Sequence, residues 1–178
     1  MRVFVASVGR CGSVSFRVAC AHASNYTTGH ESLCGLLEYP DQHIEVSPHL
    51  RCCIVHLARK YPDAKWVHLR RSAATCVPSL ARLDGGAVMA AYRLLHSSVM
   101  PSASIGDVAF RYYWSEVDVI DAQLRCEVAE DRRTVIELES AAEHWPDFWR
   151  WIGAEGDLAA SLAEWSVRRN TGEERGES

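Results

Sequence analysis

The chain has 178 residues, of which 48% are hydrophobic and 24% are charged, and its formal net charge is −4. These proportions are ordinary for a globular protein. The length favours a single domain, which we expect over residues 1–170, followed by a disordered tail over residues 171–178. No apolar run reaches the ~18 residues that a membrane span needs, and no basic stripe with interleaved aromatic residues indicates nucleic-acid binding. We therefore expect neither membrane nor nucleic-acid partners.

The charge is unevenly distributed along the chain. Residues 1–83 contain ten Lys or Arg against five Asp or Glu, whereas the remaining residues contain nine against eighteen. Because positive charge attracts anions, the N-terminal half is the expected site of an anionic ligand.

The seven cysteines indicate reduced thiols rather than a disulfide framework, because their number is odd and their spacing irregular. The N-terminus does not resemble a signal peptide, so we expect a cytoplasmic protein. Two fragments, Cys52-Cys53-x-x-His56 and Cys20-x-His22, contain residue types that bind metals. Neither has a second pair at zinc-finger spacing, so buried structural cysteines are the favoured interpretation.

The first sixteen residues show a pattern typical of a phosphate-binding loop. Val3–Ala6 predicts a strand, Ser7–Ser13 a glycine-containing turn and Val14–Ala23 a helix. Glycines let the backbone approach an anion, and a helix N-terminus offers unpaired N–H groups and the positive end of its dipole. Ser13 is placed to cap this helix and to donate its hydroxyl to a phosphate oxygen.

The cation in this loop is an arginine. The loop lacks the G-x-x-x-x-G-K-[ST] sequence of a Walker A motif, because no lysine follows Gly12. Arg10 suits a bidentate interaction with a phosphate or sulfate. The residues alone also allow a simpler alternative, a tight turn with a solvent-facing arginine.

A second strand–turn–helix unit follows in the same half of the chain. The segment Ala64–Leu69 predicts a strand, and Arg70-Arg71-Ser72 then leads into a predicted helix over Ala73–Leu83. Ligands of open α/β sheets bind at the carboxyl ends of the strands, so both units place cations where an anion would bind. Between the units we expect a loop over 25–29, an apolar segment over 33–37, a strand over 43–46 and a helix over 49–61.

The second half of the chain is predicted to be mainly helical. Helical periodicity extends over 85–98, 105–126 and 158–167, a strand is expected over 132–139, and a short helix over 144–153 ends at Gly153. We expect core packing for the aromatic residues of the segment 105–126 and for Trp145, Trp149 and Trp151. An acceptor pocket or a stacking surface is the alternative.

His30-Glu31 is a candidate for proton transfer. Glu31 could act as a general base, and the unperturbed pKa of histidine, near 6.5, suits His30 to the same role. The alternative is that Glu31 or Ser32 simply caps the following helix.

Three motifs together resemble the sulfotransferases that use 3′-phosphoadenosine 5′-phosphosulfate (PAPS), closest to the tyrosylprotein and bacterial branches. Gly9-Arg10-Cys11-Gly12-Ser13-Val14 resembles the family loop that holds the 5′-phosphosulfate. Gly29-His30-Glu31 stands where the family places its catalytic glutamate. Arg71 and Ser79 have the separation of the family's arginine and serine that hold the 3′-phosphate.

This resemblance implies a three-layer α/β/α fold with a short, mainly parallel central sheet, like that of P-loop NTPases. It implies transfer of a sulfuryl group from PAPS to a hydroxyl or amine, with 3′-phosphoadenosine 5′-phosphate (PAP) as product and without a metal. The acceptor would be a small molecule, a carbohydrate or a peptide tyrosine. Arg10 and the residues from Gly9 to Val14 would hold the phosphosulfate, and Glu31 or His30 would be the base. Arg168 and Arg169 resemble the family's basic stretch that reaches back to the nucleotide.

The chain also departs from the family pattern. Pro78 stands where the family has an ordinary helix former, and proline breaks a helix interior. As an alternative to the helix over Ala73–Leu83, a loop over 74–77 with Pro78 as the first helical residue would still leave Ser79 facing the site. The short chain leaves little material for an acceptor-binding lid. This keeps a non-catalytic nucleotide-binding module as the alternative. A kinase is disfavoured by the missing loop lysine and by the lack of a clear Mg²⁺-binding aspartate.

Overall fold

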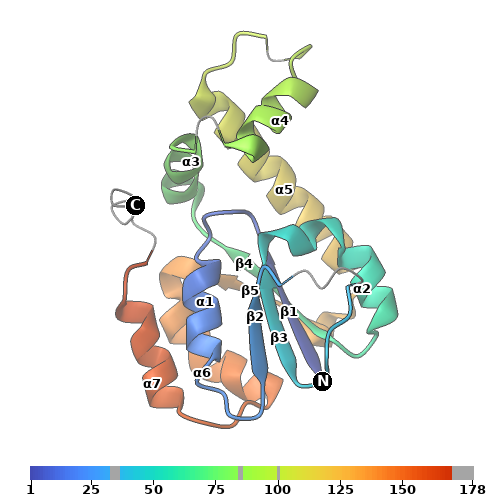
Figure 1. The fold of residues 1–178 in the computed structure, drawn as a ribbon, viewed down its shortest axis with the longest axis vertical. Helices are drawn as coiled ribbons and strands as arrows, with labels where there is room; N and C mark the ends of the chain where they lie inside the picture. Colours follow the sequence, from blue (N-terminus) through green and yellow to red (C-terminus); the bar gives the residue numbers. More distant parts are fainter. Residues whose placement is uncertain (33–36, 84–85, 100, 170–178) are drawn as a thin grey trace.

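The computed structural model describes residues 1–32, 37–83, 86–99 and 101–169. Five strands form one sheet in the order β2-β3-β1-β4-β5, and all neighbouring strands are parallel (Figure 1). The strands are β1 (Arg2–Ser7), β2 (Thr27–His30), β3 (His43–Ser47), β4 (Lys65–Arg70) and β5 (Arg133–Glu137). The predicted α/β class with a short parallel sheet is confirmed.

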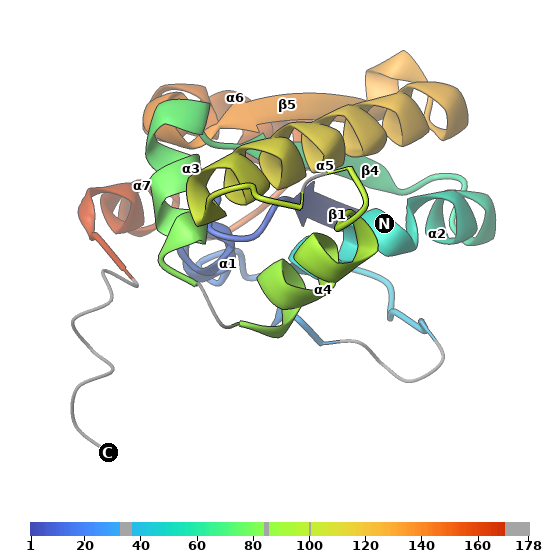
Figure 2. The same ribbon diagram turned by 90° about the horizontal axis from the view of Figure 1, so that it is seen from above.

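Helices cover both faces of the sheet, with α1, α6 and α7 together on one face and α2 and α5 on the other (Figures 1 and 2). None of the described helices is both long and apolar enough to cross a membrane. The helical elements are α1 (Ser13–Cys20), η1 (Pro48–Cys52), α2 (Ile54–Lys60), α3 (Ala73–Ala81), α4 (Ala87–Leu95), α5 (Ile105–Glu127), η2 (Glu130–Arg132), η3 (Leu138–Ser140), α6 (Ala141–Ile152), α7 (Leu158–Ala163) and η4 (Glu164–Ser166).

Two elements differ from the sequence-based expectation. The loop expected over 25–29 overlaps β2, a polar edge strand that pairs with β3 from Thr27 to His30. The helix expected over 49–61 is interrupted at Cys53. Its first part is the 3-10 turn η1, which starts at Pro48 and is capped by Ser47, whose Oγ accepts from the backbone N–H of His49 at 3.1 Å.

Pro78 does not mark the start of a helix. α3 begins at Ala73, as predicted, and contains Pro78 in its interior, so the alternative with a loop over 74–77 is wrong. An interior proline removes one backbone hydrogen bond and costs about 3 kcal/mol. The packing of α3 against α5 offsets this cost, because Cys76 and Leu80 on its inner face are 0% and 2% exposed.

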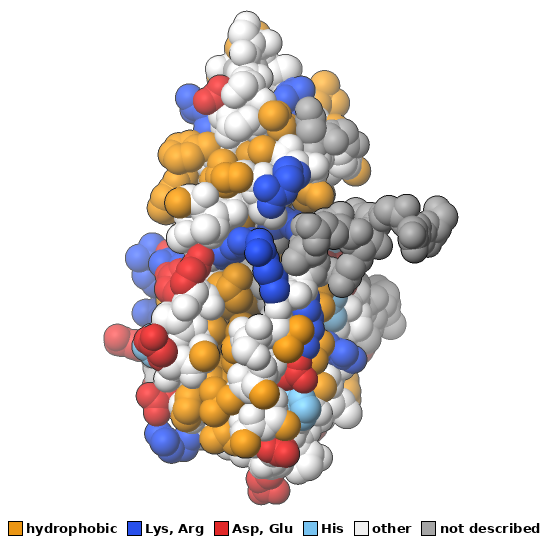
Figure 3. Space-filling view, turned by 90° about the vertical axis from the view of Figure 1, so that its left-hand side faces the viewer, with side chains coloured by type: hydrophobic (Ala, Val, Ile, Leu, Met, Phe, Trp, Pro, Cys, Tyr) orange, Lys and Arg blue, Asp and Glu red, His pale blue; other side chains and the backbone are white. Residues whose placement is uncertain are grey.

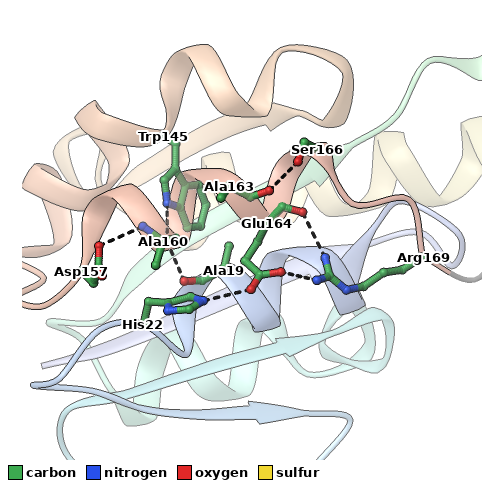
Figure 4. A network of polar contacts seen from close by, with 10 residues as sticks. Ala19, His22, Trp145, Asp157, Ala160, Ala163, Glu164, Ser166 and Arg169 are labelled. Carbon is green, nitrogen blue, oxygen red and sulfur yellow. Dashed lines mark hydrogen bonds and ion pairs between the residues drawn. The ribbon is translucent and has the colours of Figure 1, made fainter.

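An aromatic cluster joins α1 to α6 and η4. Phe16 packs against Trp145, Phe148 and Trp165 with ring centroids 5.0, 5.2 and 5.9 Å away. The indole N–H of Trp145 donates to Ser161 Oγ at 2.7 Å, and the Ser161 hydroxyl donates to the Ala19 carbonyl at 2.6 Å (Figure 4). The predicted core role is therefore confirmed for Trp145.

The predicted core role of the α5 aromatics is only partly right. Tyr113 is buried, but Phe110 and Trp114 are 53% and 42% exposed. They lie four residues apart on the side of α5 that turns away from its packed neighbours. Because core residues have the same spacing, periodicity alone did not separate these two side chains from the core. Of the α6 residues, Trp149 is buried, whereas Trp151 is half-buried and its ring lies 4.8 Å from Lys65 Nζ.

The carboxyl ends of all five strands meet at one edge, because the sheet is entirely parallel. In Figure 1 this edge is at the top of the sheet, where the loop after β1 lies, and α3, α4 and the first half of α5 rise above it. The residues predicted to bind an anion come from the segments that leave this edge.

Candidate functional site

The loop between β1 and α1 has the backbone shape that its glycines allow. Gly12 has a φ of 87°, a conformation that strains other residues, and a Cβ atom there would lie 2.5 Å from Leu138 Cδ1 and displace that side chain, so the turn favours glycine. Arg10 also has a positive φ, of 70°. Around Gly9 the space is open within 4 Å, which leaves the backbone on that side accessible.

Ser13 does not cap α1, contrary to the sequence-based expectation. The capping residue is Gly12, without a side-chain hydrogen bond, and Ser13 is the first helical residue. Its hydroxyl instead forms a hydrogen bond with His30 Nε2 at 3.0 Å. The contact joins the start of α1 to the end of β2, and it brings two predicted site residues together.

Arg10, Arg71 and Ser79 also come together. Arg10 Nε donates to Ser79 Oγ at 3.1 Å, and Arg71 Nη1 donates to the carbonyl oxygen of Arg10 at 3.0 Å. Arg71 is further oriented by its Nε, which donates to Thr75 Oγ1 at 3.1 Å. The predicted 5′ and 3′ binding elements are therefore in direct contact. Basic side chains form a band across the middle of the face in Figure 3, at the level where α3 lies above the start of α1.

A buried thiol pair lies directly behind the loop. Cys11 Sγ and Cys76 Sγ are 3.8 Å apart, and both approach the carbonyl oxygen of Gly9. The hydrogen bond from Cys11 lowers the pKa of the Cys76 thiol, and the positive charges of Arg71 and Arg10 lower it further against the effect of burial. The same contact and burial raise the pKa of Cys11. The lowered pKa of Cys76 therefore reflects first its contact with Cys11 and only second the two arginines of the site.

The start of α3 is fixed by residues that the sequence analysis did not single out. The carboxylate of Glu139 accepts from the backbone N–H of Ser72 at 3.1 Å and from Thr75 Oγ1 at 3.1 Å. The hydroxyl of Tyr113 donates to the carbonyl oxygen of Arg71 at 2.6 Å. Glu139 lies in η3, two residues after the end of β5, and it is the last residue of the strand predicted over 132–139, which was the available signal.

Glu31 and His30 lie at the same edge of the sheet. His30 is the last residue of β2, and Glu31 follows it with an exposed side chain and a φ of 55°. The alternative role of Glu31 or Ser32 as a cap depends on residues 33–36, which lie outside the described residues. The backbone N–H and the hydroxyl of Ser32 donate to the carboxylate of Glu45, with the N–H bond at 2.9 Å.

The two C-terminal arginines have different surroundings. Arg169 donates to both the carbonyl oxygen and the carboxylate of Glu164, and the same carboxylate contacts His22 Nε2 at 3.0 Å (Figure 4). Arg169 is thus bound to a residue that sits beside the C-terminal end of α1. Arg168 is exposed. Their nucleotide-binding role stays a prediction, and the expected tail over 171–178 lies outside the described residues.

The two fragments considered as metal sites do not assemble into a metal-binding cluster. Over residues 1–32, 37–83, 86–99 and 101–169, no group of three or more His, Cys, Asp or Glu side chains is placed to hold an ion. Cys20 is buried as expected, whereas Cys52 is exposed and Cys53 is half-buried, which corrects their interpretation as buried structural cysteines.

Two surface hollows of about 410 and 400 Å³ lie away from the candidate site. The first is lined by residues such as Arg2 and Tyr61, near the amino ends of the strands. The second lies between β5 and α6. Neither of these two hollows includes a residue of the loop or of α3.

Comparison with known proteins supports the fold. No protein-family model matches the sequence, and no curated protein sequence matches it significantly. Among solved structures, the crystal structure of a sulfotransferase from Alicyclobacillus acidocaldarius is similar, with a TM-score of 0.55 and 13% sequence identity. The match covers 96% of this chain and 86% of that chain. At this identity the likeness concerns the fold and not a branch of the sulfotransferases, and the chain has the α/β fold of a solved bacterial sulfotransferase.

Proposed function

We propose that the chain transfers a sulfuryl group from PAPS to a hydroxyl or amine of an acceptor. The observation that carries the proposal is the pair of contacts from Arg10 to Ser79 and from Arg71 to the loop backbone. They join the two elements that the family resemblance assigns to opposite ends of one nucleotide. The similarity in fold to a solved sulfotransferase supports the same reading.

The residues at this edge fit a donor with a sulfuryl group on its 5′-phosphate. The loop backbone is kept bare of side chains at Gly9 and Gly12, and the N–H groups of Ser13 and Val14 lie at the start of α1, where a helix leaves its first donors unpaired. Arg10 adds a fixed positive charge. Together these groups would stabilise negative charge on the sulfuryl oxygens and on the departing 5′-phosphate, which is the main requirement of such a transfer.

Arg71 and Ser79 would bind the 3′-phosphate, the group that separates PAPS from ATP. Ser79 Oγ accepts from Arg10 and keeps its own proton to donate. Two of the Arg71 nitrogens hold Arg10 and Thr75, and the guanidinium has five N–H donors in all, so further donors remain for an anion.

Glu31 would accept the proton of the acceptor. As the acceptor oxygen or nitrogen bonds to sulfur, the bond from sulfur to the 5′-phosphate oxygen breaks and PAP departs. The exposed carboxylate at the carboxyl edge suits Glu31 to this proton transfer. His30 is already bonded to Ser13, which favours an orienting role for its ring. The acceptor class (small molecule, carbohydrate or peptide tyrosine), the cytoplasmic location and the absence of nucleic-acid or membrane partners stay predictions.

Calorimetric titration with PAP, in the absence of added metal, tests this proposal, with ADP and ATP as controls. We expect PAP to bind more tightly than ADP, which lacks the 3′-phosphate, and we expect Arg71→Ala to remove that preference. Equal binding of PAP and ADP, or no binding of PAP, would overturn the proposed function.

A further inference from the structure

Glu45 is a buried carboxylate that the proposed function leaves unexplained. It lies in the middle of β3 with 0% exposure, and no other Asp or Glu in the described part of the chain is buried. Its oxygens accept from the backbone N–H of Ser32 at 2.9 Å and from the Ser32 hydroxyl, and Oε2 lies 3.2 Å from His43 Nε2. Burying a carboxylate is costly unless hydrogen bonds compensate it, so this group marks a site where a specific arrangement is maintained.

Those hydrogen bonds hold the residue that follows the candidate base. Glu31 has a φ of 55°, a conformation that costs a non-glycine residue free energy and persists only where its surroundings hold it. Its backbone N–H donates to the carbonyl oxygen of Val46 at 3.3 Å. The next N–H, that of Ser32, donates to Glu45. The strained backbone of Glu31 is therefore held on both sides by β3.

Gly29 shows how closely the chain wraps around this carboxylate. A Cβ atom at Gly29 would lie 2.2 Å from Glu45 Oε2, 2.3 Å from Ser32 Oγ and 3.1 Å from His43 Nε2. Such distances exclude any side chain unless the carboxylate moves. The glycine at position 29 is thus explained by its close packing against side chains of β3.

We propose that Glu45 is a positioning residue for the general base. Its carboxylate fixes residues 29–32 and so holds Glu31 at the carboxyl edge of the sheet, while Glu45 itself touches neither donor nor acceptor. This inference rests on the proposed function, because it assigns Glu45 a role in the same proton transfer. A displacement of about 1 Å at a reacting group can reduce turnover ~100-fold.

Hydrogen exchange of the backbone amides tests the structural half of the proposal without any ligand. In Glu45→Gln the residue keeps its shape but loses the charge, so we expect faster exchange confined to residues 29–32. Ser161→Ala is the matched control, because the Ser161 side chain is also 0% exposed and also has two hydrogen-bond partners. These partners are Trp145 in α6 and the Ala19 carbonyl in α1, and neither belongs to β2 or β3. That control should leave exchange at residues 29–32 unchanged.

Kinetics test the functional half, with PAPS as donor and 4-methylphenol as the model acceptor, because its hydroxyl stays protonated at neutral pH and therefore needs a base. We expect kcat of Glu45→Gln to fall about 10- to 100-fold while the affinity for PAP stays unchanged, because the loop and α3 are untouched. Gly29→Ala should have the same effect, since the new Cβ must displace the carboxylate. Gly106→Ala is its matched control, because the nearest atom to a Cβ there is Ser104 Oγ at 3.6 Å.

The outcomes separate this proposal from the proposed function. If Glu45→Gln speeds exchange at residues 29–32 no more than Ser161→Ala does, or if its kcat equals that of the wild-type chain, the positioning role is overturned. A purely structural role would lower the yield or thermal stability of Glu45→Gln while leaving kcat per folded molecule intact. Failure of the wild-type chain to bind PAP would overturn the proposed function and, with it, the role of Glu45 in positioning a general base. The exchange comparison would still decide whether Glu45 holds residues 29–32.

Discussion

The two sides of the carboxyl edge are built differently. On the loop–α3 side, made of residues 8–13 and 71–79, the cationic side chains bond to other groups of the same side, as Arg10 does to Ser79. On the β2–β3 side, made of residues 27–32 and 43–47, the Glu31 side chain is exposed while its backbone is held by neighbours in β3. One side presents fixed positive charge, and the other presents an accessible carboxylate on a fixed backbone.

This difference indicates a division of labour. Groups that bind an anion must be in place before it arrives, so their side chains are oriented by one another. A general base must reach a proton on a second molecule, so its side chain stays accessible. Changes on the loop–α3 side should therefore alter nucleotide affinity, and changes on the β2–β3 side should alter turnover alone.

The largest expected effect is that of Glu31→Gln. The amide keeps the size of the side chain but cannot accept a proton, so turnover of PAPS should fall by about 10² to 10⁴-fold. PAP binding measured by calorimetry should stay within about twofold of the wild-type value, because the loop–α3 side is unaltered. Full activity in this variant would move the base to His30 or elsewhere, and His30→Gln would then be the variant to measure.

Arg10→Ala should have the next largest effect, on both affinity and turnover. Removing a preorganised positive group from a site of developing negative charge costs on the order of 10²-fold in turnover. The substitution also removes the partner of Ser79. Arg10→Lys, which keeps the charge but not the planar donor group, serves as the comparison in steady-state assays. Wild-type turnover in Arg10→Ala would contradict the role assigned to this residue.

Arg71→Ala should reduce PAP affinity by about 10- to 100-fold, the value of a hydrogen-bonded charged group, while ADP affinity changes little. Thr75→Val sharpens the test, because Thr75 orients Arg71 through the bond from Arg71 Nε without lying at the loop itself. We expect a smaller loss of PAP affinity in that variant. An equal loss for PAP and ADP in Arg71→Ala would mean that Arg71 supports the loop rather than reading the 3′-phosphate.

The sequence was sufficient for the elements that local patterns encode. β1 and β4 are apolar runs followed by turns that contain Gly or Arg, and α1 and α3 follow them directly, so these four elements were predicted nearly in place. β2 was missed because Thr27–His30 is short and polar, and it becomes a strand only by pairing with β3. The sequence left open whether α3 could continue through Pro78, because the packing between α3 and α5, which offsets the lost hydrogen bond, is not visible in a local pattern.

The site was predictable as a set of residues but not as a set of contacts. Spacing and family resemblance singled out Arg10, Arg71 and Ser79, yet the bond from Arg10 to Ser79 joins residues 69 positions apart and depends on the order of the strands. Ser13 was predicted to cap its own helix because that role is local, whereas its actual partner is His30 on an edge strand. Glu45 gave no signal, since a single acidic residue in a short strand is usually exposed.

A buried histidine in β4, which contacts α5, allows a test of whether the stability of the fold can change while both sides of the carboxyl edge stay intact. His68 in β4 is 1% exposed, its Nδ1 lies 2.8 Å from Asp121 Oδ1, and Arg70 lies beside it. Burial lowers the pKa of His68 to about 4, and the nearby Arg70 also lowers it, against the opposing effect of the bond to Asp121. The unfolded chain takes up a proton below about pH 6.5, but the folded chain does so only below about pH 4. The free energy of unfolding should therefore fall as the pH is lowered through this window, by about 2 kcal/mol between pH 7 and pH 5.

Urea unfolding at the two pH values, monitored by fluorescence, measures the His68 contribution. His68→Asn keeps a donor near the position of Nδ1 for Asp121 but does not titrate, so the pH dependence of its unfolding free energy should be smaller by about 2 kcal/mol. PAP affinity at pH 7 should be the same in both chains, because His68 contacts neither side of the carboxyl edge. An identical pH dependence in the variant would show that His68 takes up its proton at the same pH in the folded and the unfolded chain. A loss of PAP affinity would show that the surroundings of His68 and the carboxyl edge are coupled through β4.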